Sequence, residues 1–356
     1  MAHPEDLNRS LCRHGDVKRA LDDHEIFSNA VSTHLAVPNG MDPPEHTAYR
    51  RIVDRYFTPS RMATFEPACH QIAVDLVERL SGESEIAPMA EFAADFAVRM
   101  QSAFLGWPTD LHEPLRQWLA KNHAATTTRD KVAMAAVALE FDVYIKELLA
   151  VRRAAGESAP DDITTSLLRE RVGGRLLEDD EIVSILRNWT VGELGTIAAS
   201  VGILTHYLAA HPAVQQQLRE HRSSLPAAID EILRIHAPLI SSRRITAKPV
   251  EIGGRTLQAG ERVTLDWVSA NRDKTVFGDP DEFRLDREPS ENLLYGAGIH
   301  ACPGAPLARL ELRVVMEELL ERTGHIGLVP GKEPVQATYP AGGFSSLPMW
   351  IRPSPQ

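Results

Sequence analysis

Cysteine is scarce in this sequence: its 356 residues include three, Cys12, Cys69 and Cys302. They are far apart, form no Cys-x-x-Cys pair and are odd in number, so we do not expect a framework of disulfide bonds. Unpaired cysteines are typical of proteins that fold in a reducing compartment. The cysteine content therefore favours a cytoplasmic location.

Long apolar runs and an excess of basic residues are also missing. No uninterrupted apolar stretch is long enough to cross a bilayer, and the first ten residues do not resemble a signal peptide. Lys and Arg number 38 against 49 Asp and Glu, which gives a formal net charge of −11. This balance argues against a membrane or a nucleic acid as the main partner.

Helical periodicity is what the sequence has in abundance. Apolar residues make up 43% of the chain, which is enough for a sizeable core, and in most segments they recur at helical spacing. There is no internal repeat and no linker-like shift in composition, so we expect one domain over residues 1–356. The predicted helices cover residues 63–82, 86–106, 131–154, 163–171, 179–210, 227–236 and 305–322.

The longest of these helices, 179–210, is expected at the centre of the fold. From Trp189 to Tyr207 it is apolar almost all round, which is typical of a buried helix. It is expected to end before Pro212, because proline cannot continue a helix.

A change of period marks a smaller β part. Residues 249–268 alternate around Gly253-Gly254 and Ala259-Gly260, which predicts a small antiparallel sheet. Residues 274–298 are rich in Pro, Asp and Gly and predict ordered coil. The predicted fold class is therefore mainly α with a minor β part.

The last cysteine lies in the segment Tyr295-Gly-Ala-Gly-Ile-His-Ala-Cys-Pro-Gly304. Its glycines build a loop whose backbone can approach a flat ligand. Cys302 precedes the predicted helix 305–322, where backbone N–H groups and the helix dipole stabilise a thiolate, a suitable iron ligand. Two alternatives stay open for the cysteine alone: a small buried hydrophobe, which is the commoner case, or a nucleophile.

This segment resembles the cysteine loop of the cytochrome P450 family, with Tyr295 in place of the usual Phe. Glu231-Ile-Leu-Arg234 is similar to the family's Glu-x-x-Arg helix, and Arg287 resembles the arginine that completes a Glu-Arg-Arg cluster. The resemblance implies the cytochrome P450 fold, a structural role for this trio, and Cys302 as the thiolate ligand of haem iron. A thiolate ligand favours cleavage of the O–O bond.

The resemblance extends to residues that hold the haem carboxylates. The segment Asp42–Arg51 is similar to one that supplies a histidine and an arginine to a haem propionate, and its His46 and Arg50 are four residues apart on a helix. Arg244 resembles the propionate arginine ahead of the small sheet. The resemblance thus assigns the binding of haem b to His46, Arg50, Arg244, His300, Cys302 and Gly304.

Two features depart from the family pattern. The stretch Leu11–Leu21 is similar to the family's early strand and second helix, so we expect a P450 fold abbreviated at the N-terminus. The family commonly has an acid followed by threonine in the central helix, to relay protons to O2. Here one alignment puts Leu194 and Gly195 at these two positions and the other puts Gly195 and Thr196 there, so the pair is broken either way. Either Glu193 and Thr196 substitute for it, with water between them, or Glu193 pairs with a basic neighbour and Thr196 bonds a carbonyl; we assign catalytic roles to Glu193, Gly195 and Thr196.

The central helix also weakly resembles members that demethylate small methoxy-aromatics. Gly195 removes bulk over the haem and leaves room for a flat ring. Phenylalanines cage the ring in those members; Phe27 and Phe344 stand at plausible positions, and ordinary core packing is the alternative for each. The predicted apolar substrate wall comprises Phe27, Leu119, Val191, Gly195, Leu239, Ile240, Ser241, Ser242 and Phe344.

These patterns predict a monooxygenase that inserts one atom of O2 into a small apolar or aromatic substrate, by hydroxylation or oxidative O-demethylation. No Gly-x-Gly-x-x-Gly follows a strand, so the electrons are expected from a ferredoxin or a flavin/iron–sulfur reductase. The expected docking face is basic and comprises Arg50, Arg51, Arg309 and Arg313. Two alternatives remain: a peroxide-driven peroxygenase, and a non-catalytic carrier of haem or another ligand.

Overall fold

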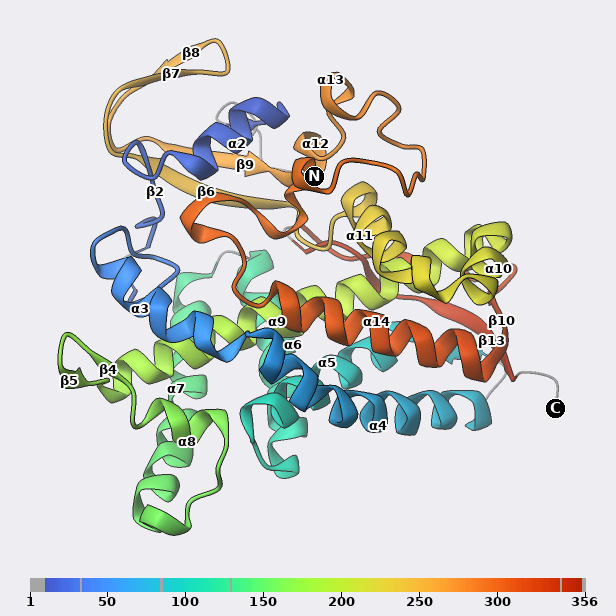
Figure 1. Ribbon diagram of the computed structural model, residues 1–356, viewed down its shortest axis with the longest axis horizontal. Coiled ribbons are helices and arrows are strands. Elements are labelled where there is room, and N and C mark those ends of the chain that lie inside the picture. The colour runs from blue at the N-terminus through green and yellow to red at the C-terminus, as the bar shows by residue number, and fades with distance from the viewer. Residues whose placement is uncertain (1–9, 33, 84–85, 129, 340, 354–356) are drawn as a thin grey trace.

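Helices form most of the structure, and short strands lie around them (Figure 1). The computed structural model describes residues 10–32, 34–83, 86–128, 130–339 and 341–353. The helices are α2 (His14–Asp22), α3 (Glu45–Val53), α4 (Pro59–Glu83), α5 (Met89–Leu105), α6 (His112–Thr128), α7 (Lys131–Ala155), α8 (Ile163–Leu167), α9 (Asp179–Ala210), α10 (Pro212–Glu220), α11 (Leu225–His236), α12 (Trp267–Ala270), α13 (Lys274–Phe277) and α14 (Ala305–Arg322). The predicted mainly α architecture is confirmed.

The strands gather in small sheets. One has the order β1 (Ser10–Leu11), β9 (Arg262–Asp266), β6 (Ser241–Thr246), β2 (Phe27–Ser28), and another has the order β10 (Thr323–Leu328), β13 (Pro348–Pro353), β3 (Ile86–Pro88). The remaining strands form the two-stranded pairs β4 (Arg171–Val172) with β5 (Arg175–Leu176), β7 (Val250–Ile252) with β8 (Arg255–Leu257), and β11 (Val335–Gln336) with β12 (Phe344–Ser346).

Helix α9 crosses the centre of the molecule, with α14 in front of it in Figure 1 and α4 beside α14. Its bounds agree with the predicted helix 179–210. A capping box fixes its start, because the side chains of Glu178 and Glu181 each accept a backbone N–H of the other. Its apolar residues belong to one large core that also includes α4, α5 and α14. The prediction of a central buried helix is confirmed.

Two predicted helices needed correction at their ends. The range 86–106 begins with strand β3, which pairs with β13, and α5 starts only at Met89. Gly106 ends α5 in the left-handed conformation (φ 74°). The range 163–171 holds the short helix α8 and then β4, because Gly173 and Gly174, both at positive φ, turn the chain into a hairpin.

The predicted antiparallel sheet at 249–268 is confirmed in part, because its first two strands pair with each other, its third strand pairs elsewhere, and its last residues begin helix α12. Strands β7 and β8 do pair around Gly253-Gly254. Strand β9, however, leaves this hairpin and pairs antiparallel with β6 and parallel with β1. Alternation identifies a strand but not its partner, since the partner is chosen by tertiary packing.

The C-terminal strands and helices α6 and α10 were not predicted.

The two glycines before β12 lie close to two other segments of the chain. A Cβ at Gly342 would lie 2.3 Å from the Ala237 carbonyl oxygen, and one at Gly343, where φ is 78°, would lie 3.1 Å from Ala199 on α9. Glycine at both positions therefore lets β12 lie against the central helix.

The described residues include no single helix that is long and apolar enough to span a membrane. Helices α9 and α10 meet the length and composition criteria only as a pair bent by 105°.

Candidate active site

The loop before α14 presents the sulfur of Cys302. The Cys302 N–H donates to the Tyr295 carbonyl oxygen at 2.8 Å, which closes the loop. Gly298 (φ 64°) packs on α2, where a Cβ would lie 2.3 Å from the Leu21 carbonyl oxygen. The backbone N–H groups of Gly304 and Ala305, at the start of α14, donate to the sulfur. The sequence therefore builds an anion-stabilising cradle at this helix start, as predicted.

Cys302 reaches the surface of the chain, yet the atoms packed around its sulfur work against ionisation. This desolvation raises the pKa of the Cys302 thiol, while the two N–H groups and the Arg50 guanidinium lower it without reversing the shift. The chain alone thus favours the thiol, and a bound metal cation would favour the thiolate, because coordination deprotonates a thiol.

Four basic side chains gather on the α2–α3 side of this loop. The rings of His46 and His300 lie 4.4 Å apart between centroids. The pKa of His300 is lowered to about 3, by burial first and then by the nearby positive groups His46 and Arg244. Arg50 donates to the Ile299 carbonyl oxygen at 3.1 Å. The structure thus brings His46, Arg50, Arg244 and His300 together, as the resemblance implied.

The same cluster lacks acceptors for its buried donors. The Nε2 atoms of His46 and His300 are buried without a hydrogen-bond partner in the described part of the chain. Arg244 is 5% exposed and donates only to the Arg243 carbonyl oxygen (2.8 Å) among the described residues. Burial lowers the pKa of Arg244 to about 10. Buried donors without acceptors fit a ligand that brings carboxylates, as the two propionates of haem b do.

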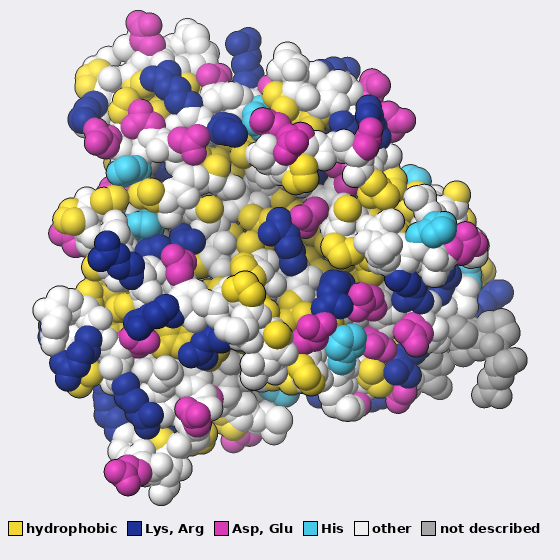
Figure 2. Space-filling view, in the orientation of Figure 1, with side chains coloured by type: hydrophobic (Ala, Val, Ile, Leu, Met, Phe, Trp, Pro, Cys, Tyr) yellow, Lys and Arg dark blue, Asp and Glu magenta, His cyan; other side chains and the backbone are white. Residues whose placement is uncertain are grey.

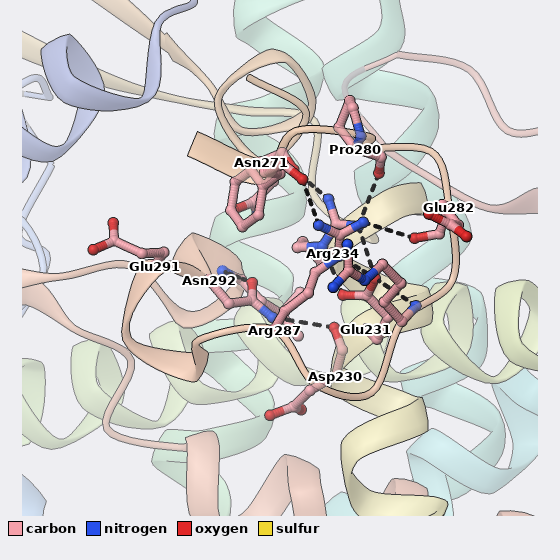
Figure 3. Close-up of polar contacts among 12 residues, drawn as sticks. Asp230, Glu231, Arg234, Asn271, Pro280, Glu282, Arg287, Glu291 and Asn292 are labelled. Atoms are coloured by element: carbon pink, nitrogen blue, oxygen red, sulfur yellow. Dashed lines mark hydrogen bonds and ion pairs between the residues drawn. The ribbon is translucent and has the colours of Figure 1, made fainter. Parts of the chain in front are cut away.

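The predicted structural trio is assembled, and Figure 3 shows its polar contacts. Arg234 donates to both oxygens of Glu231, at 2.7 and 2.9 Å, and Arg287 donates to Oε1 at 2.8 Å. Arg234 also donates to the carbonyl oxygens of Asn271 (2.6 Å) and Pro280 (2.8 Å). The trio therefore ties α11 to the coil between α12 and the cysteine loop.

The face of α9 around residue 195 is open. Gly192 and Gly195 are exposed, and a Cβ on either would meet nothing within 4 Å. The Thr196 hydroxyl donates to the Gly192 carbonyl oxygen at 2.6 Å. Among the residues that the structure describes, no basic group pairs with Glu193, and its carboxyl faces another acid, Glu311 on α14. The carbonyl bond of Thr196 agrees with the second alternative offered by the sequence, whereas the described residues show no basic partner for Glu193.

Several predicted wall residues meet beside α9. Leu239 forms a bridge with Ala341, and the Ser241 hydroxyl lies 2.8 Å from the Tyr339 hydroxyl. The Phe344 ring contacts the His206 ring of α9 in a tilted arrangement, with 4.6 Å between centroids and an angle of 38° between the ring planes. This arrangement brings the loop before β6 and the C-terminal strand to the same helix. Val191 and Gly195 lie on α9, Leu239 and Ile240 lie in the loop before β6, Ser241 and Ser242 lie at the start of β6, and Phe344 lies on β12.

Phe27 and Leu119 are placed differently. Phe27 is buried in a second core, with Leu11, Val17 and Val263, and this core contains none of the other predicted wall residues. The pocket role predicted for Phe27 is therefore corrected to core packing, since β2 is part of the β1-β9-β6-β2 sheet. Leu119 on α6 is half-buried against the large core.

Sequence reasoning missed Glu311, Gln101 and His206. Glu311 is fully buried among the apolar residues of α14, and Gln101 is fully buried on α5. The signal was available: a charged or amide side chain at a position where helical periodicity requires an apolar one. Such residues are expected to have a polar partner or a function.

The predicted basic docking face is largely neutralised. Arg50 pairs with Asp54 (2.5 Å), Arg309 with Asp230 (2.9 Å), and Arg313 with Glu317 (2.8 Å) and Glu66. Figure 2 shows basic and acidic side chains interspersed over this side of the molecule. Arg51 is exposed.

Comparison with known proteins finds the same family that the residues of this site suggest. The family model described as Cytochrome P450 matches residues 99–326. The protein named "Cyclomarin C epoxidase CymV", from Salinispora arenicola, is 30% identical over 339 residues, which cover 91% of this chain and 86% of that protein. "Nocardicin C N-oxygenase", from Nocardia uniformis, is 34% identical over 332 residues, which cover 88% and 81% respectively.

Solved structures show the same likeness. The open form of cytochrome P450 EryK from S. erythraea superposes with a TM-score of 0.89 at 29% identity, covering 98% of this chain and 91% of that one. A cytochrome P450 from Bacillus megaterium, solved with corticosterone, gives a TM-score of 0.84 at 26% identity, covering 96% and 91%. The chain therefore belongs to the cytochrome P450 family, so the predicted family, fold, haem cofactor and enzyme class, a haem-thiolate monooxygenase, are confirmed.

Proposed function

We propose that this P450 inserts one oxygen atom of O2 into a small apolar or aromatic substrate that lies beside α9. The observation that carries the proposal is exposed apolar surface on α9 and on the loop before β6. Val191 and Leu239 are 44% and 42% exposed although both are apolar, and the Phe344 ring stands on the same helix. Exposed apolar side chains around an open helix face are typical of a ligand wall.

The haem bound by Cys302 supplies the activation of O2. The chain's own residues orient the substrate and keep water from it. Hydroxylation and oxidative O-demethylation both follow from one inserted oxygen, because a hydroxylated methoxy carbon breaks away as an aldehyde. The site of attack is then set by how the wall holds the substrate.

A larger substrate is the second candidate. Relatives carry names such as "Erythromycin C-12 hydroxylase", from a protein 30% identical over 328 residues. The placement of Phe27 in a separate core also leaves Phe344 as the one phenylalanine of the predicted cage. Both observations favour a substrate site that is larger than a small methoxy-aromatic requires.

Spectral titration of the ferric protein tests these proposals. A tight apolar ligand displaces the iron-bound water and changes the spin state, so methoxy-aromatics, terpenes and macrolides are compared in parallel. Gly195→Val adds bulk where nothing lies within 4 Å; we expect aromatic binding to weaken at least about tenfold, or about 1.4 kcal/mol. Gly15→Val on α2, where nothing lies within 4 Å either, is the control away from α9. No response to any apolar ligand would contradict the substrate proposal.

The electron source is part of the proposal: a ferredoxin or a flavin/iron–sulfur reductase. Since three of the four predicted docking arginines are in ion pairs, Arg51→Glu is the cleanest charge reversal, and slower reduction at low salt supports docking there. Product formed with hydrogen peroxide, but with none of the reductases tested, would favour the peroxygenase alternative.

We also propose a cytoplasmic location and a single domain over residues 1–356.

A further inference from the structure

Helix α7 exposes apolar side chains along its outer face. Of the twelve large apolar side chains that are exposed in the described part of the chain, five lie on this helix. Val132 is 80% exposed, Leu139 65% and Val143 53%. The inner face of the same helix is buried in the large core, through Phe141 and Ile145 among others. Since a surface helix normally has a polar outer face, this exposed face points to a binding partner.

The spacing of the exposed residues is that of a coiled-coil seam. They recur after four, three, four, three and four positions, which is the alternation of the a and d positions of a heptad. Val143 falls at an a position and Leu139 at a d position, a combination that favours two-stranded coiled coils. The α7 seam consists of Val132, Ala136, Leu139, Val143, Lys146 and Ala150, all of them exposed. A second helix with a matching seam is the partner that this spacing fits.

The charges beside the α7 seam favour a second copy of the chain as that partner. Lys146 and Glu147 lie on opposite sides of the centre of the seam, each about 50° away around the helix. Glu147 is exposed and forms no ion pair with any residue that the structure describes. When two α7 helices pack in parallel about a two-fold axis, Lys146 of each copy lies across from Glu147 of the other. The Lys146 ammonium, 2.7 Å from Asp180 at the surface, has donors for both carboxylates.

A lipid surface is a poorer match for this face. Helices that lie on membranes carry an excess of Lys and Arg beside their apolar face. Beside the α7 seam, Glu140 pairs with Lys121 (2.8 Å) and Asp142 pairs with Arg187, so the basic residues are balanced by acids. The net charge of −11 also opposes binding to anionic lipids.

The area of the face is sufficient for a weak dimer. A groove between α6 and α7 lies beside the seam; it is lined by Lys121, Ala124, Ala125, Thr128, Ala133, Ala136, Val137 and Glu140. The seam is about 27 Å long and the two helices are about 20 Å wide, so two copies bury about 1,000 Å2 in total, the lower limit of a specific interface. Association is therefore expected to be reversible and to depend on concentration.

We infer that this protein forms a homodimer in which the α7 seams of two copies pack in parallel about a two-fold axis. Leu139 and Val143 then pack against their own counterparts, and Lys146 of each copy pairs with Glu147 of the other. The polar Lys146 at one seam position fixes the register of the pair. The inference goes beyond the proposed function and does not depend on the substrate.

Sedimentation of the haem-loaded full chain tests the dimer. The mass should rise from one chain toward two as the protein concentration approaches about 0.1 mM. Leu139→Lys, a change at an exposed side chain, should weaken association at least about tenfold, because the apolar contact is lost on both copies. Met134→Lys is the matched control, since Met134 is also exposed on α7 but lies outside the seam. A monomer at all these concentrations, or equal association of the two variants, overturns the inference, as does a monomer that binds phosphatidylcholine vesicles through Leu139.

Disulfide trapping tests the parallel arrangement. In a Cys12→Ser background, which removes an exposed thiol, Ala136→Cys places a thiol at an a position and Ala135→Cys places one beside the seam. Each a residue of a parallel pair faces its own counterpart, so mild oxidation should link the Ala136→Cys chains, whereas the Ala135→Cys thiols are too far apart. Equal linking of both variants overturns the seam. Linking that instead requires Leu139→Cys on one copy and Val143→Cys on the other overturns the parallel arrangement.

Discussion

At the scale of single residues, the iron ligand is the first point to test. Cys302→Ala should remove the strongly red-shifted Soret band of the reduced, CO-bound protein, because that band requires a thiolate ligand. Cys69→Ala is the control: Cys69 is fully buried against α14, so the band should persist while stability falls by about 1 kcal/mol. An intact, haem-loaded protein without the band would contradict thiolate ligation.

Arg244 should have opposite effects on the haem-free and haem-loaded protein. It is buried without a carboxylate partner among the described residues, and burial lowers its pKa to about 10. Arg244→Met should therefore leave the haem-free fold as stable, or up to about 1 kcal/mol more stable. The same change should weaken haem retention about tenfold, because a charge-assisted hydrogen bond to a propionate is lost.

Urea unfolding of the haem-free protein and haem transfer to apomyoglobin measure the two effects separately. Arg243→Met, a change at the exposed neighbour, controls for the loss of a positive charge. Equal haem retention in both variants would show that Arg244 does not hold a propionate.

At the scale of elements, the start of α9 carries a pH-dependent contribution to stability. Arg175 donates to both oxygens of Glu181 at 2.7 and 2.8 Å, Glu178 N–H donates at 2.7 Å, and Tyr49 donates as well. The Arg175 pair, followed by these other donors, lowers the pKa of Glu181 to about 2. A lowered carboxyl pKa stabilises the fold above the unfolded value, 4.5, and this contribution is lost as the pH falls toward 2.

Glu181→Gln should therefore cost about 2 kcal/mol at neutral pH, a value reduced from the full shift because Arg175 is half exposed. The difference in the free energy of unfolding between this variant and the unmodified protein should fall by more than half near pH 3. Urea unfolding at several pH values measures it. Asp180→Asn, one residue earlier and exposed, should change little; a pH-independent cost for Glu181→Gln would argue against the ion pair.

The cysteine loop depends on close contact with α2. Gly298→Ala should destabilise the protein by about 1–3 kcal/mol and weaken haem binding, because its Cβ would lie 2.3 Å from the Leu21 carbonyl oxygen at a positive φ. Gly15→Ala on α2, where nothing lies within 4 Å, should be neutral or stabilising by up to about 1 kcal/mol. Thermal unfolding and haem content compare the two variants.

At the scale of the whole molecule, the Glu231 cluster joins segments distant in sequence. Glu231→Gln leaves the buried arginines Arg234 and Arg287 without their carboxylate, so it should cost about 3–5 kcal/mol. Asp286→Asn, in an exposed pair with Arg284 of the same coil, should have no measurable effect. Chemical unfolding of the holoprotein tests the contrast; a small effect of Glu231→Gln would mean that water reaches the cluster.

Helix bounds were largely predictable because local signals set them. Helix α9 starts at a capping box and ends before Pro212, and α14 follows the glycine of the cysteine loop. Strand pairing was less predictable. The partners of β9 are residues far away in the chain, and alternation of side chains carries no information about them.

By itself, the sequence determined the helical architecture and the cysteine loop with Cys302, because motif spacing and periodicity are local properties, and the Glu231 trio followed from the resemblance to the cytochrome P450 family. The tertiary structure decided which neighbours each side chain meets. It placed Phe27 in a core away from the substrate wall and paired three docking arginines with acids. It also set Glu193 against Glu311, residues on different helices. These outcomes depend on packing between distant segments, which no pattern along the chain encodes.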